Sequence, residues 1–222
     1  MCEIEKQRIE KPYYTLDMEM NGRSDEMISI GCVYVDERGS DTFYRLVKPR
    51  LMPFKMIYRM TGITRQQLEE ADEFEKVLQD FINWCKAHQR RKIKMYVWGD
   101  DQKIFHRAKQ RNALSERLVV SLLNLVEITN IQIAVSSQVK VNGICWRKQI
   151  GLLNMANLYQ IPLTKQTHNA LDDAIVLQWI LDAYHNQRAF DTKMMEAIEK
   201  EVIELQTRKK SRQKAETENS SN

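Results

Sequence analysis

Residues 13–20 carry the sequence YYTLDMEM, an apolar stretch that contains two carboxylates, Asp17 and Glu19. The stretch predicts a β-strand, in which residues two apart point to the same face. The two carboxylates then project side by side, while the apolar residues around them point to the opposite face. Like charges this close repel each other and are costly to bury, and a hard divalent cation relieves both problems. An edge strand with both acids in water is the alternative explanation.

This strand is the first of three that follow one another closely. Residues 27–36 and 42–48 are rich in alternating and β-branched residues, and the sequence ERGS between them is a hairpin signal. The short connections predict three antiparallel strands in a meander.

After residue 48 the pattern becomes helical. Apolar residues recur every three or four positions over residues 72–88, residues 93–98 form a short strand, and residues 118–129 predict a helix that gives way to a strand. Three strands followed by alternating helices and strands indicate an α/β fold with a mixed sheet flanked by helices. Helices are also predicted for the other periodic segments, which are 101–111, 149–159, 168–184 and 190–206.

These elements predict one main domain over residues 12–186. We expect a polar leader over residues 1–11, an amphipathic helix over 187–207 and a basic, polar tail over 208–222 that is disordered. The tail holds five basic and two acidic residues, and a second run, residues 86–94, holds five basic residues and no acid. Such runs attract phosphate backbones or simply face solvent, so charge alone does not establish nucleic-acid binding.

The composition excludes several classes of protein. Apolar residues make up 43% of the 222 residues and charged residues 29%, which is ordinary globular usage. No stretch approaches the roughly 18 apolar residues of a membrane span, and no apolar run near the first residue suggests a secretory signal. The four cysteines form no C-x-x-C pair, which argues against a zinc ribbon or a disulfide framework. We expect a reduced, cytoplasmic protein that does not contact a membrane.

Two adjacent acids, Asp100 and Asp101, stand where the strand at 93–98 meets the next helix. Either carboxylate could cap that helix, which is the ordinary explanation for an acid at this place. Phe105 lies four residues after Asp101, on the same helical face. This spacing favours Asp101 as the residue that points inward and Asp100 as the cap.

A histidine and two more acids open the helix predicted at 168–184. His168 precedes the helix body, Asp172 and Asp173 lie in its first turn, and Thr167 is the predicted N-cap. Acids in a first turn also suit the helix dipole. Apolar residues follow both Asp172 and Asp173 at helical spacing, so periodicity does not show which of the two carboxylates lies at the buried face.

Together these pieces resemble the DnaQ-like 3′→5′ exonucleases of the DEDDh group, which have four acids and one histidine in the site. The family has Asp-x-Glu on the first strand, then Asp at a strand-to-helix junction, then His-x-x-x-x-Asp opening a late helix. In this chain the matching residues are Asp17, Glu19, Asp101, His168 and Asp173. The family spacing from His168 selects Asp173 over its neighbour.

Residues 60–64, MTGIT, are similar to the LTGIT segment of the branch that includes the enhanced-RNAi and KapD-type exonucleases. The Trp98-Gly99 pair is also typical of that branch, and the resemblance covers roughly residues 12–186. The chain departs from the family at Met20, where the family often has threonine. It also has one residue, in place of the usual two, between Trp98-Gly99 and Asp101.

The resemblance implies an RNase H-like fold with a five-stranded mixed sheet. It implies two divalent ions, Mg²⁺ or Mn²⁺, held by Asp17, Glu19, Asp101 and Asp173, with His168 as the general base. The implied substrates are the 3′ ends of single-stranded RNA or DNA, or 3′ overhangs, with RNA favoured. The implied products are nucleoside 5′-monophosphates.

Two alternative functions use the same fold. One is a noncatalytic nucleic-acid-binding or scaffold protein, and the other is a proofreading exonuclease of a DNA polymerase. The helix at 190–206 could cover the domain's own core, which we favour, or dock a partner or a second copy in a homodimer.

Overall fold

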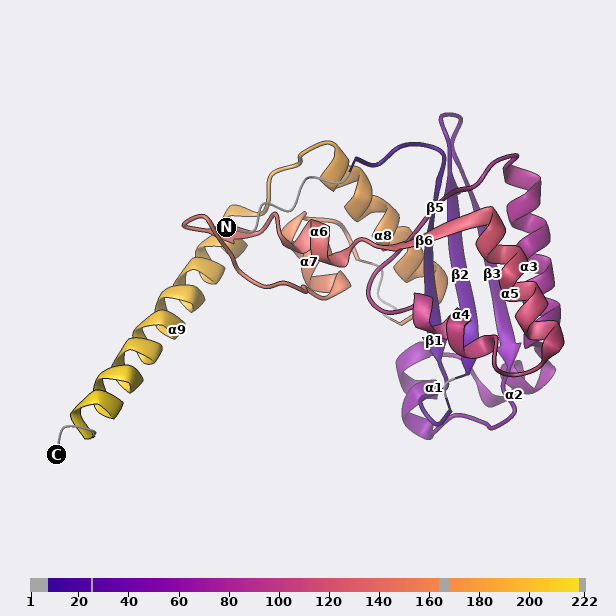
Figure 1. Cartoon of the computed structure of the whole chain (residues 1–222), viewed down its shortest axis with the longest axis horizontal. Helices are drawn as coiled ribbons and strands as arrows, with labels where there is room; N and C mark the ends of the chain where they lie inside the picture. Colours follow the sequence, from indigo (N-terminus) through magenta and orange to yellow (C-terminus); the bar gives the residue numbers. More distant parts are fainter. Residues whose placement is uncertain (1–7, 25, 164–167, 220–222) are drawn as a thin grey trace.

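The computed structural model describes residues 8–24, 26–163 and 168–219, and its main element is a mixed sheet in the order β4-β3-β2-β1-β5-β6. The central strand, β1 (Tyr13–Met20), pairs antiparallel with β2 (Met27–Val35) and parallel with β5 (Ile93–Val97) (Figure 1). The outer strands are β3 (Ser40–Lys48), β4 (Asp72–Glu73) and β6 (Val126–Asn130). The predicted α/β fold and the meander of β1, β2 and β3 are confirmed.

The sheet has six strands, so the expected count of five is wrong by one. The additional strand, β4, pairs parallel with β3 at Val47 and Lys48. Residues 72–73 were expected to begin a helix, but they stay extended beside the end of β3. The helix α3 begins after them, at Phe74.

Helices cover both faces of the sheet. On one face lie α3 (Phe74–His88), α4 (Gln102–Ala108) and α5 (Ala113–Leu125), and on the other lies α8 (Ala170–His185), which packs on β1 and β2 (Figure 1). The switch from α5 into β6 agrees with the predicted change from helix to strand. The remaining helices are α1 (Lys55–Thr61), α2 (Arg65–Glu70), α6 (Gln132–Ser136), α7 (Leu152–Leu158) and α9 (Thr192–Asn219).

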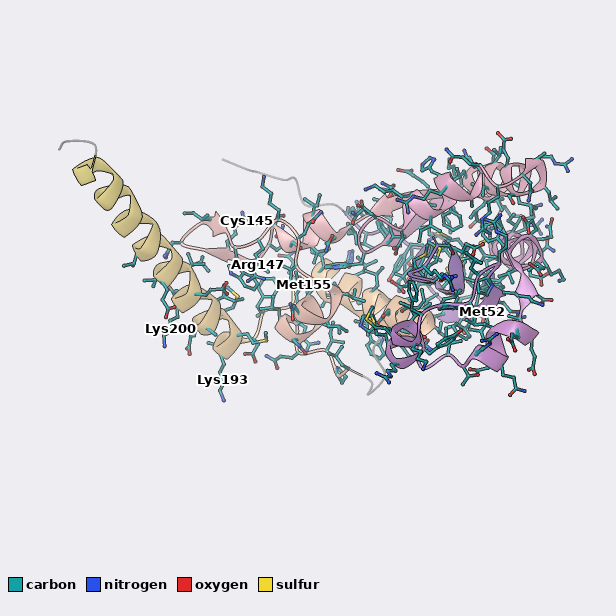
Figure 2. All side chains as sticks on the ribbon, turned by 90° about the horizontal axis from the view of Figure 1, so that it is seen from below. Met52, Cys145, Arg147, Met155, Lys193 and Lys200 are labelled. Carbon is teal, nitrogen blue, oxygen red and sulfur yellow. The ribbon has the colours of Figure 1, made fainter. Side chains whose placement is uncertain are left out.

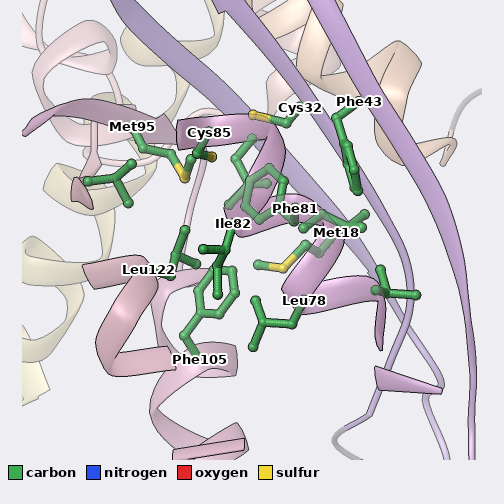
Figure 3. Close-up of a cluster of buried hydrophobic side chains, with 14 of the residues drawn as sticks. Met18, Cys32, Phe43, Leu78, Phe81, Ile82, Cys85, Met95, Phe105 and Leu122 are labelled. Carbon is green, nitrogen blue, oxygen red and sulfur yellow. The ribbon is translucent and has the colours of Figure 1, made fainter. Parts of the chain in front are cut away.

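The first hydrophobic core fills the space between the sheet and the α3–α5 layer. Figure 3 shows Met18 of β1 reaching into it among Leu78 and Phe81 of α3 and Phe105 of α4. Met18 alternates with the two carboxylates of β1, so its burial here directs those carboxylates to the α8 face.

The second core joins α8 to α6, α7 and the first part of α9. Met155 of α7 lies in it, in the half of the molecule away from Met52 (Figure 2). Ile198 of α9 is buried against this core, and the side chain of Asp191 caps the helix by accepting a hydrogen bond from the Met194 N–H at 2.8 Å. The preferred expectation for this helix, that it covers the domain's own core, is confirmed for its first turns.

The helix α9 continues through Asn219, beyond the expected end near residue 207. The expectation of a disordered tail therefore fails for residues 208–219, whose backbone is helical. The reason is local, because lysine, arginine, glutamine, alanine and glutamate dominate this segment and are all strong helix formers. No helix in the described part of the chain has the length and apolar character required to cross a membrane.

A small second sheet pairs β7 (Lys140–Val141) with β8 (Ile144–Cys145). Asn142 and Gly143 join the two strands, and both have positive φ, at 51° and 75°. An Asn-Gly pair with this geometry is the preferred two-residue hairpin turn. The signal was present in the sequence, although the strands are too short for alternation to reveal them.

The start of α8 depends on a glycine in the neighbouring strand. Gly31 of β2 pairs with Asp17 of β1, and a Cβ atom at Gly31 would lie 2.2 Å from backbone atoms of Ala170 and Leu171. No real Cβ atom makes contacts that short. Only glycine therefore lets the first turn of α8 lie against the sheet beside Asp17.

We expect Gly31→Ala to lower the free energy of unfolding by about 1–3 kcal/mol, because the added methyl group overpacks a backbone contact. Chemical denaturation followed by circular dichroism measures the change. Gly151→Ala is the matched control, since a Cβ atom there meets nothing within 4 Å. Equal unfolding free energies for the two variants would contradict this role of Gly31.

Candidate active site

Asp17 and Glu19 project from the face of β1 that α8 covers. On the same face, the hydroxyl of Thr15 donates a hydrogen bond to the carbonyl of Ala174 in α8, at 2.8 Å. Thr15 is fully buried, so this bond fixes the strand against the helix next to Asp173. The two carboxylates of β1 therefore face the first turn of α8 and not open solvent at a sheet edge.

The first turn of α8 brings His168 and Asp173 to β1. The N-cap is Asn169, whose side chain accepts hydrogen bonds from the N–H groups of Leu171 and Asp172, at 3.0 and 3.2 Å. The predicted cap, Thr167, lies outside the described residues, and the observed cap lies two residues later. An asparagine amide oxygen satisfies the free N–H groups of a helix start as well as a hydroxyl does.

His168 stands at the exposed side of this cluster. Its φ of 65° lies in the left-handed region, which is uncommon for a residue with a side chain. In this conformation, potential ligand atoms of His168, Glu19 and Asp173 lie within 4.8 Å of one another. Asp173, and not its neighbour Asp172, belongs to this group.

Asp101 comes from the chain after β5, which pairs with β1 along the edge opposite to β2. It follows β5, which runs parallel to β1, so the carboxyl ends of both strands meet at one edge of the sheet. Gly99, with φ at 108°, makes the turn and donates its N–H to the side chain of Asn130 at 3.2 Å. Asp101 Oδ2 is buried and has no hydrogen-bond partner among the described residues.

Asp100 is placed differently from its neighbour. Its carboxylate is largely exposed and forms an ion pair with Lys103 at 2.5 Å on the surface of α4. The expected division of roles holds in position, since Asp101 points inward. The N-cap position of α4 is occupied by Asp101 itself, whose side chain makes no cap hydrogen bond, so the expectation that Asp100 caps this helix is wrong.

The four carboxylates perturb one another. Burial raises the pKa of Asp17 well above its usual value, and the charges of Asp101, Asp173 and Glu19 raise it further. Burial and the charge of Glu19 raise the pKa of Asp101 to about 7. Burial and the charge of Asp173 raise the pKa of Glu19 to about 6, although His168 opposes this shift. The four acids thus form one electrostatic unit.

Such a unit suits a divalent cation. The buried oxygen of Asp101 without a partner and the mutual repulsion of the carboxylates are both relieved by a positive ion. Carboxylate oxygens are the ligands that Mg²⁺ and Mn²⁺ prefer. The residues that could hold the ions are Asp17, Glu19, Asp101 and Asp173, with His168 beside them.

Sequence reasoning missed two residues that position the first turn of α8 in the site. Gly31 admits the first turn of α8, and Asn169 caps it. The Asn-Ala pair after His168 carried a cap signal of its own, because asparagine is among the best N-cap residues. Nothing local marks Gly31, since the contact that requires it comes from a helix far away in the chain.

Two solved exonuclease structures resemble this chain. The nuclease domain of 3′hExo, a DEDDh family member, bound to rAMP, superposes with a TM-score of 0.58 at 19% identity, covering 81% of this chain and 94% of that one. A 3′-exonuclease in a structure of 3′-end-specific recognition of a histone mRNA stem-loop gives a TM-score of 0.62 at 17% identity, with coverage of 83% and 67%. At these identities the two likenesses establish the fold.

Among curated proteins, the PolC-type DNA polymerase III of Caldanaerobacter subterraneus subsp. tengcongensis is 31% identical over 83 residues. That match covers 36% of this chain and only 6% of the much longer polymerase. The sequence model of the family described as Exonuclease, RNase T, matches residues 15–181, which contain all five candidate site residues. The chain therefore belongs to the RNase T family of exonucleases.

Proposed function

We propose that this protein is a divalent-cation-dependent 3′→5′ exonuclease that releases nucleoside 5′-monophosphates from single strands or 3′ overhangs. The observation that carries the proposal is the convergence of Asp17, Glu19, Asp101 and Asp173 in one partly buried group with His168 at its exposed side. RNA is the favoured substrate, because one structural neighbour binds rAMP and another recognises an mRNA 3′ end.

The MTGIT segment supports a place in the enhanced-RNAi and KapD-type branch. In the structure this segment forms the turn between α1 and α2. Gly62 ends α1 in the left-handed conformation, and Thr64 begins α2 with a capping box to Gln67. The motif thus has a structural role of its own, and its bearing on substrate choice remains part of the proposal.

The chain's own residues divide the work of phosphodiester hydrolysis. The four carboxylates would hold two Mg²⁺ or Mn²⁺ ions, which when bound activate a water molecule and stabilise the leaving 3′-oxygen. His168 is exposed and lies within 4.8 Å of the Glu19 and Asp173 ligand atoms, so it can accept a proton from the attacking water.

The direct test uses single-stranded RNA and DNA labelled at the 5′ end, with Mg²⁺, Mn²⁺ or a chelator. We expect labelled fragments that shorten progressively from the 3′ end, only when metal is present, and faster for RNA. Asp17→Ala should abolish the ladder. Immediate release of labelled mononucleotide would refute the polarity, faster digestion of DNA would refute the preference, and binding without cleavage would indicate the noncatalytic alternative.

We expect His168→Ala to lower kcat by about 10²–10⁴-fold, the usual loss for a general base, without changing the melting temperature. Single-turnover assays and thermal unfolding measure the two quantities. His185→Ala is the matched control, because His185 is an exposed histidine at the other end of α8. A kcat for His168→Ala within a few-fold of that of His185→Ala would exclude the role of general base.

The raised pKa values predict how stability depends on pH when a chelator removes metal. Protonation of Glu19 and Asp101 is favoured in the folded state, because their pKa values there, about 6 and about 7, exceed the ordinary 4.5 and 3.8. Their stabilising effect is complete below about pH 4 and is lost as pH rises through 6 and 7. Added Mg²⁺ should therefore raise the melting temperature more at pH 8 than at pH 5.

Asp101→Asn removes one of these charges and provides the control. With chelator at pH 8, this variant should melt at a higher temperature than the unmodified protein, and Mg²⁺ should raise its melting temperature less. If Mg²⁺ shifted the melting temperature of both proteins equally at pH 5 and pH 8, the carboxylates would not form the proposed metal site.

A further inference from the structure

A groove lined by cations adjoins the cluster of carboxylates. It consists of two neighbouring depressions that share Ser24 and Arg107. The first depression includes Met20 and Asp100, which are the chain neighbours of Glu19 and Asp101. The groove therefore begins at the candidate active site and runs away from it. We call it the basic groove, and its cations are Arg23, Lys103, Arg107, Arg50 and Arg111.

Three separate segments supply the basic groove. Arg23 lies in the turn between β1 and β2, Arg50 follows β3, and the other three cations lie in or just after α4. The C-terminal end of β1 and α4 lie at the same end of the sheet (Figure 1). The cations thus gather only in the folded chain, which is why no basic run in the sequence indicates them.

The described residues that line the basic groove carry a net positive charge. Five cations face two described acids, Glu26 and Asp100, which leaves a net charge of +3. The buried Glu26 carboxylate accepts from Arg50 at 2.8 Å and from Arg111 at 3.2 Å. Arg111 also lies over the ring of Phe74, at 4.6 Å. The far end of the groove is therefore held in place by a buried acid.

Arg23 and Arg107 both line the depression that adjoins the candidate active site. Arg107 is exposed on the surface of α4, and Arg23 is exposed in its turn. The Arg23 guanidinium lies 5.5 Å from the ring of Phe54, which is itself 54% exposed. An exposed aromatic ring beside cations is the combination that single-stranded nucleic acids bind, through stacking and phosphate contacts.

We propose that the basic groove binds the phosphates of the single strand on the 5′ side of the bond being cleaved. This inference rests on the proposed function. The carboxylates attract a phosphate only through the divalent metal ions that they would hold, and they repel the other phosphates of the strand. A neighbouring groove with a net charge of +3 offsets that repulsion and holds the strand as its 3′ end enters the site.

The test compares substrates of different length. In Mg²⁺, Arg23→Ser/Arg107→Ala should lower kcat/KM for a single strand of about 12 nucleotides at least tenfold more than for a dinucleotide, which is too short to reach along the groove. Arg91→Ser/Lys92→Ser is the matched control. It removes two exposed cations just before β5, at the opposite end of the sheet, and should leave kcat/KM for both substrates unchanged.

A second readout does not require activity. Fluorescence anisotropy with a chelator measures the dissociation constant of the 12-nucleotide strand at several salt concentrations. Loss of two phosphate contacts should reduce the slope of log K against log salt by about 1.4, since each contact to a single strand contributes about 0.7. The control variant should keep the slope of the unmodified protein.

The two proposals fail in different ways. Equal losses of kcat/KM for the 12-nucleotide strand and the dinucleotide, or an unchanged salt slope, would overturn the basic groove. If the unmodified protein hydrolysed neither substrate, the proposed exonuclease activity would be wrong, and the salt slopes would still decide whether the groove binds the strand.

Discussion

The close approach of α8 to β2 at Gly31 is the constraint on which the site depends. The first turn of α8 lies where a Cβ atom of residue 31 would be, directly beside Asp17 in the paired strand. This contact brings His168 and Asp173 to the two carboxylates of β1. It also brings like charges together, so the packing of two hydrophobic cores holds in place a group of acids that repel each other.

Several parts of this arrangement follow from local patterns in the sequence. Because residues two apart in a strand point to the same face, the sequence predicted that Asp17 and Glu19 share one face of β1 and that Met18 lies on the other. The change of pattern after residue 118 predicted the switch from α5 to β6 correctly. Asp101 was favoured over Asp100 by its spacing from Phe105, and Phe105 is indeed buried in the first core (Figure 3).

Other parts depend on contacts between distant segments, which periodicity does not reveal. The two-residue strand β4 exists only because β3 offers it a partner, and the need for glycine at residue 31 arises from α8. The helical backbone of residues 208–219 was not predicted, because the polar composition was taken as a sign of disorder. The helix propensity of these residues favours a continuation of α9. The basic groove combines a turn, the end of β3 and α4, so each of its cations looks ordinary in the sequence.

In the proposed function, the acidic site would surround the 3′ end of a strand, and the basic groove would surround the phosphates that precede it. The carboxylates would bind a divalent cation and, through it, a single phosphate, whereas the cations of the groove would attract phosphates without regard to sequence. The modest net charge of +4 thus includes one acidic cluster and one adjoining group of cations, which the net charge alone does not reveal.

The central claim is that Asp17, Glu19, Asp101 and Asp173 form one metal site. Anomalous diffraction from crystals grown with Mn²⁺ and a nucleoside 5′-monophosphate tests it most directly. We expect two manganese peaks within coordination distance of these four carboxylates, with the phosphate of the nucleotide beside them. The absence of manganese from this group, or its coordination by Asp100 or Asp172 in place of Asp101 or Asp173, would contradict the claim.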